Sequence, residues 1–276
     1  TTEIYTLSLH DALPISRSQA PTISPGMELI GLSSLMAIPF IHGGIEVTTN
    51  EWQWMTSLLW TADNMHLCGG TLIQSDYVLT AAHCLKLSDN PSDYYVSVGL
   101  LDLSNLSTYG EKIRVEKIFV HGDYNRYTKD NDIALLKLSR KSKKKTIDGF
   151  WAPDEKNSII IKKNATIIGW GKTESGVLSK KLRQAEIPIV AANVCRETYG
   201  KMMTNNMFCA GHPQGGKGGC QGDSGGPIFF TNKKGKHYQV GIVSWGHGCA
   251  MEGYYGVYTK VTNYRDWLEK IIGKPL

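Results

Sequence analysis

The stretch Cys220-Gln221-Gly222-Asp223-Ser224-Gly225-Gly226-Pro227 decides how the rest of the sequence is interpreted. It places one small nucleophile, Ser224, among three glycines and ends in a proline. Because glycine has no β-carbon, these glycines let the backbone turn tightly and leave its N–H groups accessible. Two such N–H groups beside a serine hydroxyl would form a hole for a developing oxyanion. Taken alone, the stretch is also compatible with an ordinary glycine turn, so its meaning depends on a histidine base and a carboxylate elsewhere.

The composition is that of an ordinary globular protein. The chain has 276 residues, of which 41% are hydrophobic and 20% charged, and its formal net charge is +5. This mild charge does not indicate a nucleic-acid-binding domain, and no apolar run approaches the roughly 18 residues that a membrane-spanning helix needs. The six cysteines form no C-x-x-C pair, which favours disulfides over zinc and therefore an oxidising compartment. Asn105 and Asn164 begin sequons that are compatible with secretion, although such triplets often arise by chance.

The first forty residues differ in pattern from the rest. Residues 1–16 have neither helical nor strand periodicity and are interpreted as a translated sequencing adapter. They are therefore excluded from the fold, and His10 and Asp11 receive no catalytic role. Residues 17–40 contain Pro21, Pro25 and Pro39 and then an apolar patch with no basic region directly before it. We interpret them as a leader or pro-segment.

From Ile41 onward, short runs rich in Val, Ile, Leu, Tyr and Trp alternate with clusters of Gly, Asn, Asp and Ser. Many short strands at this spacing predict an all-β protein built of barrels or sandwiches. The runs fall into two series, 41–138 and 147–261. Between them, residues 139–146 include five Lys or Arg and are interpreted as a solvated linker, with a site for acidic partners as the minor alternative.

The chain is expected to end in one helix within 262–276. Thr262 or Asn263 can cap its start, and Gly273 can stop it. An apolar stripe follows the helical period at Trp267, Leu268, Ile271 and Ile272.

A histidine and an aspartate stand in two further motifs. His83 lies in Thr80-Ala-Ala-His-Cys84, just after an apolar run, and Asp132 lies in Asn131-Asp-Ile-Ala-Leu-Leu136, where an apolar strand begins. Single residues of these types are usually structural in such places. Together with Ser224, however, they supply a nucleophile, a base and an orienting carboxylate. Their order along the chain differs from that of subtilisin-type enzymes and α/β-hydrolases.

With these motifs the sequence closely resembles the trypsin–chymotrypsin family of serine endopeptidases. The resemblance runs from Ile41 to about Ile272. It includes the motifs Ile41-His-Gly-Gly44, Cys68-Gly-Gly70, Ser244-Trp-Gly246 and Gly256-Val-Tyr-Thr-Lys260. The resemblance implies two antiparallel Greek-key β-barrels, followed by the C-terminal α-helix. It places the active site in the cleft between the barrels and implies no cofactor.

The resemblance assigns a role to each motif. Ser224 would attack the scissile carbonyl, His83 would take its proton, and Asp132 would orient the imidazole. The N–H groups of Gly222 and Ser224 would form the oxyanion hole. The same resemblance implies three disulfides, Cys68–Cys84, Cys195–Cys209 and Cys220–Cys249, although the sequence alone allows other pairings.

The resemblance also implies a zymogen that is cleaved between Phe40 and Ile41. The new amine of Ile41 would pair with Asp223. The family usually has Arg or Lys where Phe40 stands, so the activator is expected to be chymotrypsin-like or the enzyme itself. His42 also departs from the usual Val or Ile. Leu100 and Leu101 stand where calcium-binding relatives have a glutamate, so no metal site is expected.

The specificity pocket is expected to be wide and uncharged. By the resemblance its floor is Gly218, with Gly219 beside it and Gly246 and Gly256 as walls. Ser244 and Trp245 are the other substrate-binding residues. Such a pocket favours Phe, Tyr, Leu or Met before the scissile bond. The alternative is trypsin-like or broad specificity, with the loop residue Glu252 reaching the pocket.

The expected partners are polypeptide substrates and protein protease inhibitors. No nucleic acid and no membrane is expected, and the protein is predicted to be a secreted monomer. One alternative is a non-catalytic homologue that acts as a binding protein, but such proteins usually lack His, Asp or Ser of the triad. A lectin-like or structural β-protein is a remote third possibility, because it would not need the three ordered motifs.

Overall fold

The structure is a computed structural model of the chain, and it describes residues 41, 43–106, 108–151, 163–173 and 175–276. The regions interpreted as an adapter (1–16) and as a leader or pro-segment (17–40) lie outside the described residues, and so do Phe40 and His42. The chain divides into residues 1–37 and 38–276, so everything described belongs to the second unit. None of the helices within the described ranges is long and apolar enough to cross a membrane.

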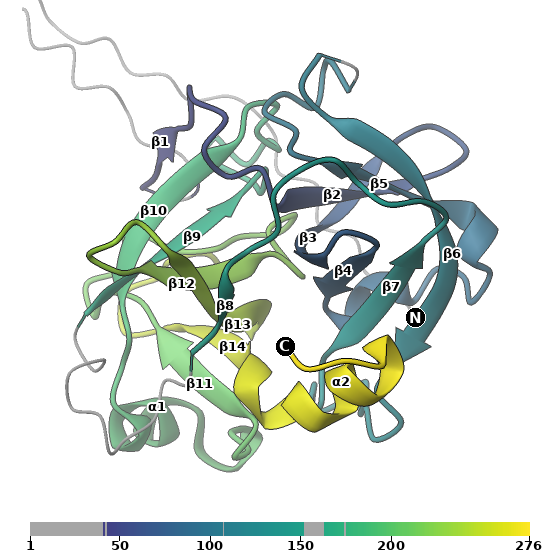
Figure 1. Cartoon of the computed structure of the whole chain (residues 1–276). Helices are drawn as coiled ribbons and strands as arrows, with labels where there is room; N and C mark the ends of the chain where they lie inside the picture. Colours follow the sequence, from purple (N-terminus) through teal and green to yellow (C-terminus); the bar gives the residue numbers. More distant parts are fainter. Residues whose placement is uncertain (1–40, 42, 107, 152–162, 174) are drawn as a thin grey trace, which may run out of the picture. The chain divides into compact units, whose positions relative to one another are not determined.

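The first half of this unit forms a closed β-barrel with the strand order β2-β3-β4-β7-β6-β5 (Figure 1). Neighbouring strands are antiparallel, and the order departs from the chain order after β4, as in a Greek key. Alternate side chains enter the barrel, because successive residues of a strand point to opposite faces. On β6, for example, Ile113 and Val115 are buried while Lys112 and Arg114 are exposed. The strands are β2 (Met55–Trp60), β3 (His66–Gln74), β4 (Tyr77–Thr80), β5 (Tyr94–Val98), β6 (Glu111–Val120) and β7 (Ala134–Leu138).

The second half forms an eight-stranded sheet with the order β1-β10-β9-β12-β13-β14-β11 and with β8 beside β13. An isolated bridge between Ile189 and Ala210 links the end of β10 to β11, so the sheet closes toward a second barrel-like domain. The pairs in this sheet are antiparallel except for β8 and β13, which run parallel. The strands are β1 (Ile45–Glu46), β8 (Gly149–Phe150), β9 (Asn164–Gly169), β10 (Arg183–Pro188), β11 (Met207–Ala210), β12 (Pro227–Thr231), β13 (His237–Gly246) and β14 (Gly256–Lys260). The predicted all-β fold with two barrels and a C-terminal helix is confirmed.

The two barrels share part of one apolar core. Phe229 of β12 packs edge-on against Trp52 and Trp54, with ring centroids 5.1 and 4.8 Å apart. The backbones also meet closely, because a β-carbon on Gly69 would lie 2.8 Å from the Cα of Gly226. A glycine is therefore required where β3 passes the segment that follows Ser224.

Three disulfides join the described segments. They link Cys68 on β3 to Cys84, Cys195 to Cys209 on β11, and Cys220 to Cys249. These are the pairs that the family resemblance implies. The third one links the segment before Ser224 to the loop after β13.

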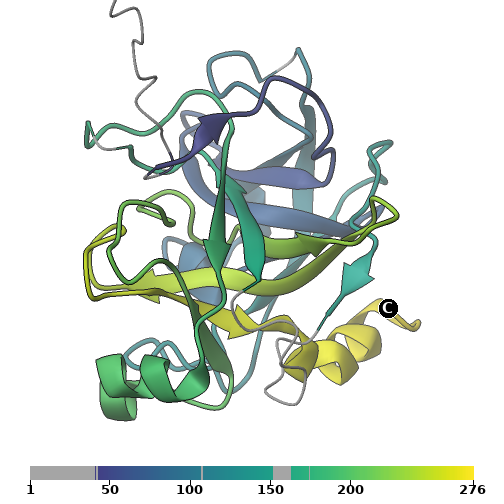
Figure 2. The ribbon, with the colours of Figure 1, turned by 90° about the vertical axis from the view of Figure 1, so that its left-hand side faces the viewer.

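The two α-helices lie at the lower edge of both ribbon views (Figures 1 and 2). The sequence analysis did not anticipate α1 (Ala192–Tyr199). It did anticipate α2 (Arg265–Ile272), which ends at Gly273 in the left-handed conformation. The predicted cap was wrong. The N-cap residue is Tyr264, without a side-chain hydrogen bond, because residues 261–264 form a 3-10 turn that displaces Thr262 and Asn263 from the helix start.

Replacing Leu268 by alanine should destabilise the fold strongly. Leu268 of α2 is fully buried in the shared core, and a cavity left by a buried leucine costs about 2–5 kcal/mol. The free energy of unfolding in urea measures this loss. Lys270→Ala on the exposed face of the same helix is the matched control and should change it by less than about 0.5 kcal/mol. Equal effects of the two changes would contradict the assigned packing of α2.

Candidate active site

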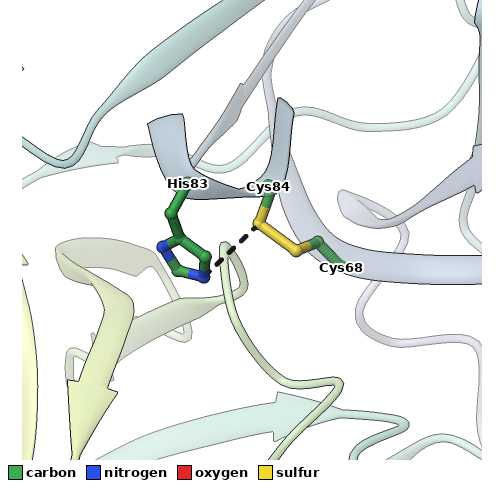
Figure 3. Close-up of side chains that lie close together, drawn as sticks. All are labelled: Cys68, His83 and Cys84. Carbon is green, nitrogen blue, oxygen red and sulfur yellow. Dashed lines mark hydrogen bonds between the residues drawn. A yellow bond between two sulfur atoms is a disulfide. The ribbon is translucent and has the colours of Figure 1, made fainter. Parts of the chain in front are cut away.

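His83 lies on a short 3-10 helix, Ala82–Leu85, directly after β4. Its side chain is 16% exposed. The disulfide from Cys84 to Cys68 ties this helix to β3, and the Sγ atom of Cys84 is 3.9 Å from Nε2 of His83 (Figure 3). Because the two sulfurs are bonded to each other, they offer no thiolate to a metal ion. The group is therefore a histidine braced by a disulfide.

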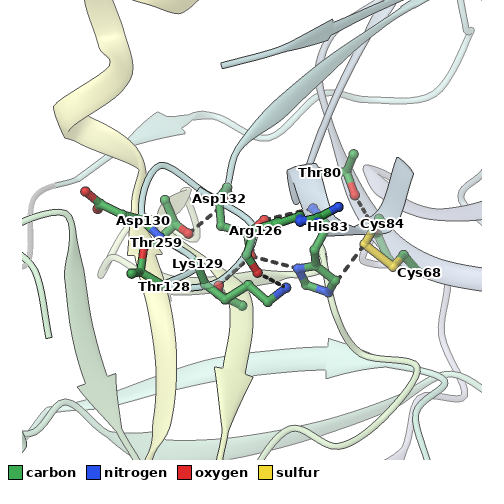
Figure 4. A network of polar contacts seen from close by, with 12 residues as sticks. Cys68, Thr80, His83, Cys84, Arg126, Thr128, Lys129, Asp130, Asp132 and Thr259 are labelled. Carbon is green, nitrogen blue, oxygen red and sulfur yellow. Dashed lines mark hydrogen bonds and ion pairs between the residues drawn. A yellow bond between two sulfur atoms is a disulfide. The ribbon is translucent and has the colours of Figure 1, made fainter. Parts of the chain in front are cut away.

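Asp132 is fully buried and binds His83 through both carboxylate oxygens. Oδ1 accepts the backbone N–H of His83 at 2.9 Å, and Oδ2 accepts from Nδ1 of the imidazole at 2.7 Å (Figure 4). An ionised carboxylate only accepts hydrogen bonds, so Nδ1 carries the proton and Nε2 of the neutral ring keeps a lone pair. The orientation leaves one basic nitrogen of His83 free to accept a proton.

Two residues from the second barrel complete the shell of Asp132. The hydroxyl of Ser244 donates to Oδ2 at 2.5 Å, and the hydroxyl of Thr259 donates to the backbone carbonyl of Asp132 at 3.0 Å. The bond from Ser244, like the two from His83, goes to the carboxylate itself and replaces hydration that burial removes, whereas the bond from Thr259 fixes the backbone of Asp132. Both barrels therefore contribute to holding this one group.

The loop before Asp132 is also fixed by the second barrel. Asp130 accepts hydrogen bonds from Thr204 (2.7 Å) and Asn206 (3.0 Å), and Asn131 accepts one from Tyr264 (3.0 Å). Burial raises the pKa of Tyr264, so its hydroxyl remains a donor at neutral pH. The sequence analysis did not identify these residues, since no local pattern marks a contact over more than seventy positions.

Ser224 lies on a tight turn that is pressed against the His83 segment. The backbone N–H of Gly69 donates to the carbonyl of Ser224 at 2.7 Å. A β-carbon on Gly225 would lie 2.3 Å from Oγ1 of Thr80 and 3.1 Å from Sγ of Cys84, the neighbour of His83. The predicted serine and histidine thus lie on touching segments. The Ser224 hydroxyl itself forms no hydrogen bond to another described residue.

The backbone around Ser224 has two unused donors. Within the described ranges, neither the N–H of Gly222 nor that of Ser224 donates a hydrogen bond. Gly222 has a φ of 99°, and a β-carbon there would lie 2.6 Å from Leu178 and 3.1 Å from the Cα of Gly171. Only glycine fits this position.

The side chain of Asp223 points away from Ser224 into the protein and is fully buried. Its oxygens accept the N–H groups of Gly171 (2.7 Å) and Cys220 (2.9 Å). A β-carbon on Gly169 or Gly171 would lie within 2.2 Å of this carboxylate, so both glycines are needed to accommodate it. Burial raises the pKa of Asp223 to about 6, although the two hydrogen bonds oppose the shift.

His66 is a half-buried residue of the site that the sequence analysis missed. Its Nδ1 lies 2.8 Å from the hydroxyl of Ser57, and its Nε2 lies 2.8 Å from the carbonyl of Gly222. Burial lowers the pKa of His66 to about 4, so the ring is neutral at pH 7. Nε2–H therefore donates to Gly222, and the Ser57 hydroxyl donates to Nδ1. This contact fixes the peptide that follows Gly222.

A cavity of about 270 Å³ opens beside Ser224. Its lining includes all six residues predicted to bind substrate: Gly218, Gly219, Ser244, Trp245, Gly246 and Gly256. A β-carbon on Gly218 would lie 3.3 Å from that of Ala250, so two small residues face each other across this part of the wall.

The cavity holds no carboxylate of a lining residue. Glu252 is exposed to solvent and is not part of the lining, whereas its neighbours Met251 and Tyr254 are. One polar group that the sequence analysis missed is the hydroxyl of Tyr258. It is buried without a partner among the described residues, and a β-carbon on Gly256 would lie 2.8 Å from it. The wall of the cavity therefore combines apolar groups with polar ones, among them Lys217 and the hydroxyls of Ser224 and Ser244, but it contains no carboxylate.

Comparison with known proteins agrees with this geometry. A sequence model of the family described as Trypsin matches residues 41–268. The protein named "Transmembrane protease serine 11G" of Mus musculus is 37% identical over 223 residues, which are 79% of this chain and 52% of that protein. Its namesake in Rattus norvegicus is 35% identical over 233 residues, 83% of this chain and 54% of that protein. "Transmembrane protease serine 9" of Rattus norvegicus is 34% identical over 272 residues, 95% of this chain and 25% of that protein. The chain thus spans about half the length of these curated relatives, or less.

The unprocessed chain should lose stability through Asp223 as the pH rises from about 4 to above 6. The folded state holds the proton of Asp223 up to a pKa of about 6, while the unfolded state releases it near 3.8, so folding is favoured below this window and the advantage disappears above it. Asp223→Asn removes this dependence. The stability advantage of the wild type over the variant should therefore shrink by about 3 kcal/mol between pH 4 and pH 7.

His66 contributes a slope of the opposite sign in the same window, because its folded pKa is lowered from 6.5 to about 4. For this reason the wild-type stability curve alone is not a sufficient test. The quantity to measure is the difference in the free energy of unfolding between wild type and Asp223→Asn, obtained by urea unfolding at each pH. Asp266→Asn on the exposed surface of α2 is the control and should leave the pH dependence unchanged. A constant difference between wild type and Asp223→Asn would contradict the raised pKa.

Proposed function

The chain belongs to the trypsin family, and on that premise we propose that it hydrolyses peptide bonds with Ser224 as nucleophile, His83 as general base and Asp132 as orienting carboxylate. The observation that carries this proposal is the fully buried Asp132, which binds Nδ1 of His83 at 2.7 Å and leaves Nε2 basic. That is the state a general base needs. Polypeptides are the substrates.

The reaction proceeds in two halves. The Ser224 oxygen attacks the scissile carbonyl carbon while its proton passes to Nε2 of His83. The charged imidazole then gives this proton to the leaving amine as the peptide bond breaks, and an acyl-enzyme remains. Water repeats the sequence in place of the serine, and the acid product leaves. Asp132 stays ionised and stabilises the imidazolium in both halves.

The unused N–H groups of Gly222 and Ser224 support an oxyanion hole at this site. They have no acceptor among the described residues, so they can bind the oxygen that becomes negative in the tetrahedral intermediate. Losing one such donor typically costs about 3 kcal/mol in the activation free energy. His66 supports the hole indirectly, because it holds the carbonyl of Gly222.

Ser224→Ala and His83→Ala should each lower turnover of a peptide substrate by about four to six orders of magnitude, since the triad acts as a unit. Thermal unfolding should show that both variants stay folded, because neither side chain fills the core. Labelling with an organophosphate should modify processed wild-type protein and spare Ser224→Ala. Near-normal hydrolysis by the purified Ser224→Ala variant would contradict the assignment of Ser224 as nucleophile. If the organophosphate failed to label processed wild-type protein, the result would favour a non-catalytic binding homologue.

We propose that the cavity beside Ser224 binds large apolar or aromatic side chains before the scissile bond. Burying such a side chain contributes about 1.5–3 kcal/mol, whereas a cation would lose its water without meeting a carboxylate. Glu252 could supply one only if its loop moved, and this is the basis of the alternative trypsin-like or broad specificity. The exposed position of Glu252 supports the apolar preference.

Matched peptides with Phe or Arg before the scissile bond should differ in kcat/KM by about a hundredfold in favour of Phe. Gly218→Asp should reverse the preference, because it adds a carboxylate to the wall where a β-carbon needs only a small adjustment of Ala250. The control Gly218→Asn adds a side chain of equal size without charge and should leave the preference for Phe unchanged. A wild-type preference for Arg that disappears in Glu252→Gln would establish the alternative.

We also propose that the active form begins at Ile41. The side chain of Ile41 is 1% exposed and packs in one apolar cluster with Val243, which lies close to Asp223. A free amine at this position would give the buried Asp223 the cation that it lacks among the described residues. Pairing would offset the cost of burying its charge and thereby order the Ser224 loop.

N-terminal sequencing of active enzyme should therefore read Ile41 as the first residue. A chymotrypsin-like protease, or the enzyme itself, should produce this end, because Phe40 precedes it. Phe40→Arg should transfer activation from a chymotrypsin-like protease to a trypsin-like one. An active enzyme with any other first residue would contradict the proposed processing.

The proposed location is extracellular, as the three disulfides suggest. The relatives are named transmembrane proteases, so the domain could act either released or as part of an anchored protein. We propose the released, monomeric form and protein protease inhibitors as further partners. Fractionation of conditioned medium tests whether the protein is released, and size-exclusion chromatography tests whether it is monomeric.

A further inference from the structure

We propose that one face of the first barrel binds a sulfated polysaccharide. This basic face consists of Lys112, Arg114, Arg140, Lys143, Lys144 and Lys145. Two of these residues lie on β6, and the other four come from the run that the sequence predicted to be a solvated linker. The catalytic proposal does not involve any of them.

Glu111, the first residue of β6, fixes the run in place. One carboxylate oxygen of Glu111 binds Nη1 of Arg140 at 2.7 Å. The other accepts the hydroxyl of Ser142 and the backbone N–H of Lys143 at 2.9 Å. Although burial opposes it, this set of donors keeps the pKa of Glu111 below its usual range, so the anchor remains charged at neutral pH. Ser142 is accordingly buried among exposed lysines.

The run lies alongside β6. The backbone N–H of Ser139 donates to the carbonyl of Arg114 at 3.0 Å, and Nη2 of Arg140 donates to the carbonyl of Lys112 at 3.3 Å. The backbone N–H of Lys145 reaches the side chain of Gln53 at 3.4 Å. These contacts place the charges of the run next to those of the strand, as one surface.

The two cations of β6 are held in a defined position. Lys112 and Arg114 are two residues apart on a strand and so point to the same face, about 7 Å from each other. Tyr95 of β5 lies opposite Arg114 in the strand register, and both cations contact it. Nζ of Lys112 is 4.4 Å from the ring centroid of Tyr95, and Nε of Arg114 donates to its hydroxyl at 2.8 Å. Fixed side chains lose less freedom on binding a ligand than mobile ones do.

Most of this charge is uncompensated. Of the six cations, only Arg140 forms an ion pair with a carboxylate among the described residues, which leaves five. Lys112 donates to the neutral amide of Asn64. The methylenes of Lys144 lie against Gly99, where a β-carbon would be 3.0 Å from Cε, so the stem is packed while the ammonium reaches solvent. Such an array attracts an anionic chain over distances up to a Debye length.

The chemistry of the face favours sulfate groups on a linear polymer. Sulfate esters stay ionised at every physiological pH and accept the charge-assisted hydrogen bonds that Lys and Arg donate. A single-stranded nucleic acid would need aromatic platforms on which its bases could stack. Among the described residues, the ring that the basic face contacts is that of Tyr95, and Lys112 already lies over it. Disulfides also assign the chain to the compartment where sulfated polysaccharides occur.

The test measures binding of heparin, as the sulfated probe, to the full chain at about 0.15 M salt. Lys143→Gln/Lys144→Gln/Lys145→Gln should weaken binding about tenfold. Lys112→Gln/Arg114→Gln should weaken it as well, which would show that strand and run act together. The control Lys233→Gln/Lys234→Gln/Lys270→Gln removes the same charge from exposed positions of the second half and should change affinity less than about twofold. Thermal unfolding of each variant should match the wild type.

Other outcomes would overturn the proposal. Equal weakening by the control would mean that net charge alone drives binding. Chemically desulfated heparin that binds as tightly as heparin would exclude sulfate recognition. Tighter binding of a single-stranded DNA of similar length would assign the face to nucleic acid instead. The readout is affinity, so neither success nor failure depends on peptidase activity.

Discussion

The burial of Asp132 is the constraint on which the rest of the structure depends. A carboxylate without water is stable only if hydrogen bonds replace its hydration. Two of its donors come from His83 of the first barrel and a third from Ser244 of the second, while Thr259 of the second barrel binds the backbone carbonyl of the same residue. Neither barrel alone supplies all the hydrogen bonds that this residue forms. The orientation of the imidazole of His83 by Asp132 therefore depends on the docking of the two barrels.

Close backbone approach around the Ser224 loop is the second organising feature. The glycines at 69, 169, 171, 222 and 225 each lie where a β-carbon would collide with a neighbour. They allow the loop to pass between the barrels while the N–H groups of Gly222 and Ser224 have no acceptor among the described residues. The same tight packing leaves the Asp223 carboxylate without water, which explains why its pKa rises although two N–H groups bind it.

The sequence predicts much of this arrangement, because its motifs are local. The Ser224 loop, the His83 and Asp132 motifs and the alternating runs each occupy a few consecutive residues, and they were sufficient for the fold and the family. Contacts between distant residues carry no such signal. His66 and Gly222 are 156 positions apart. The hydroxyl of Tyr258, which has no partner in the part of the chain that the structure describes, stands in a strand whose pattern indicates only burial. The helix α1 was missed because it has no capping side chain and buries only Cys195 and Tyr199.

The disulfide between Cys220 and Cys249 makes the shape of the cavity beside Ser224 depend on the oxidation of two thiols. It joins the segment that leads into Ser224 to the loop that forms the opposite wall of the cavity. A newly made chain with reduced thiols has no covalent link between these two segments. Fixing their relative position then costs more conformational entropy than it does in the chain that has formed the disulfide. Under the proposed function, oxidation of these two thiols is therefore the step that lowers the entropic cost of holding the pocket beside Ser224 in shape.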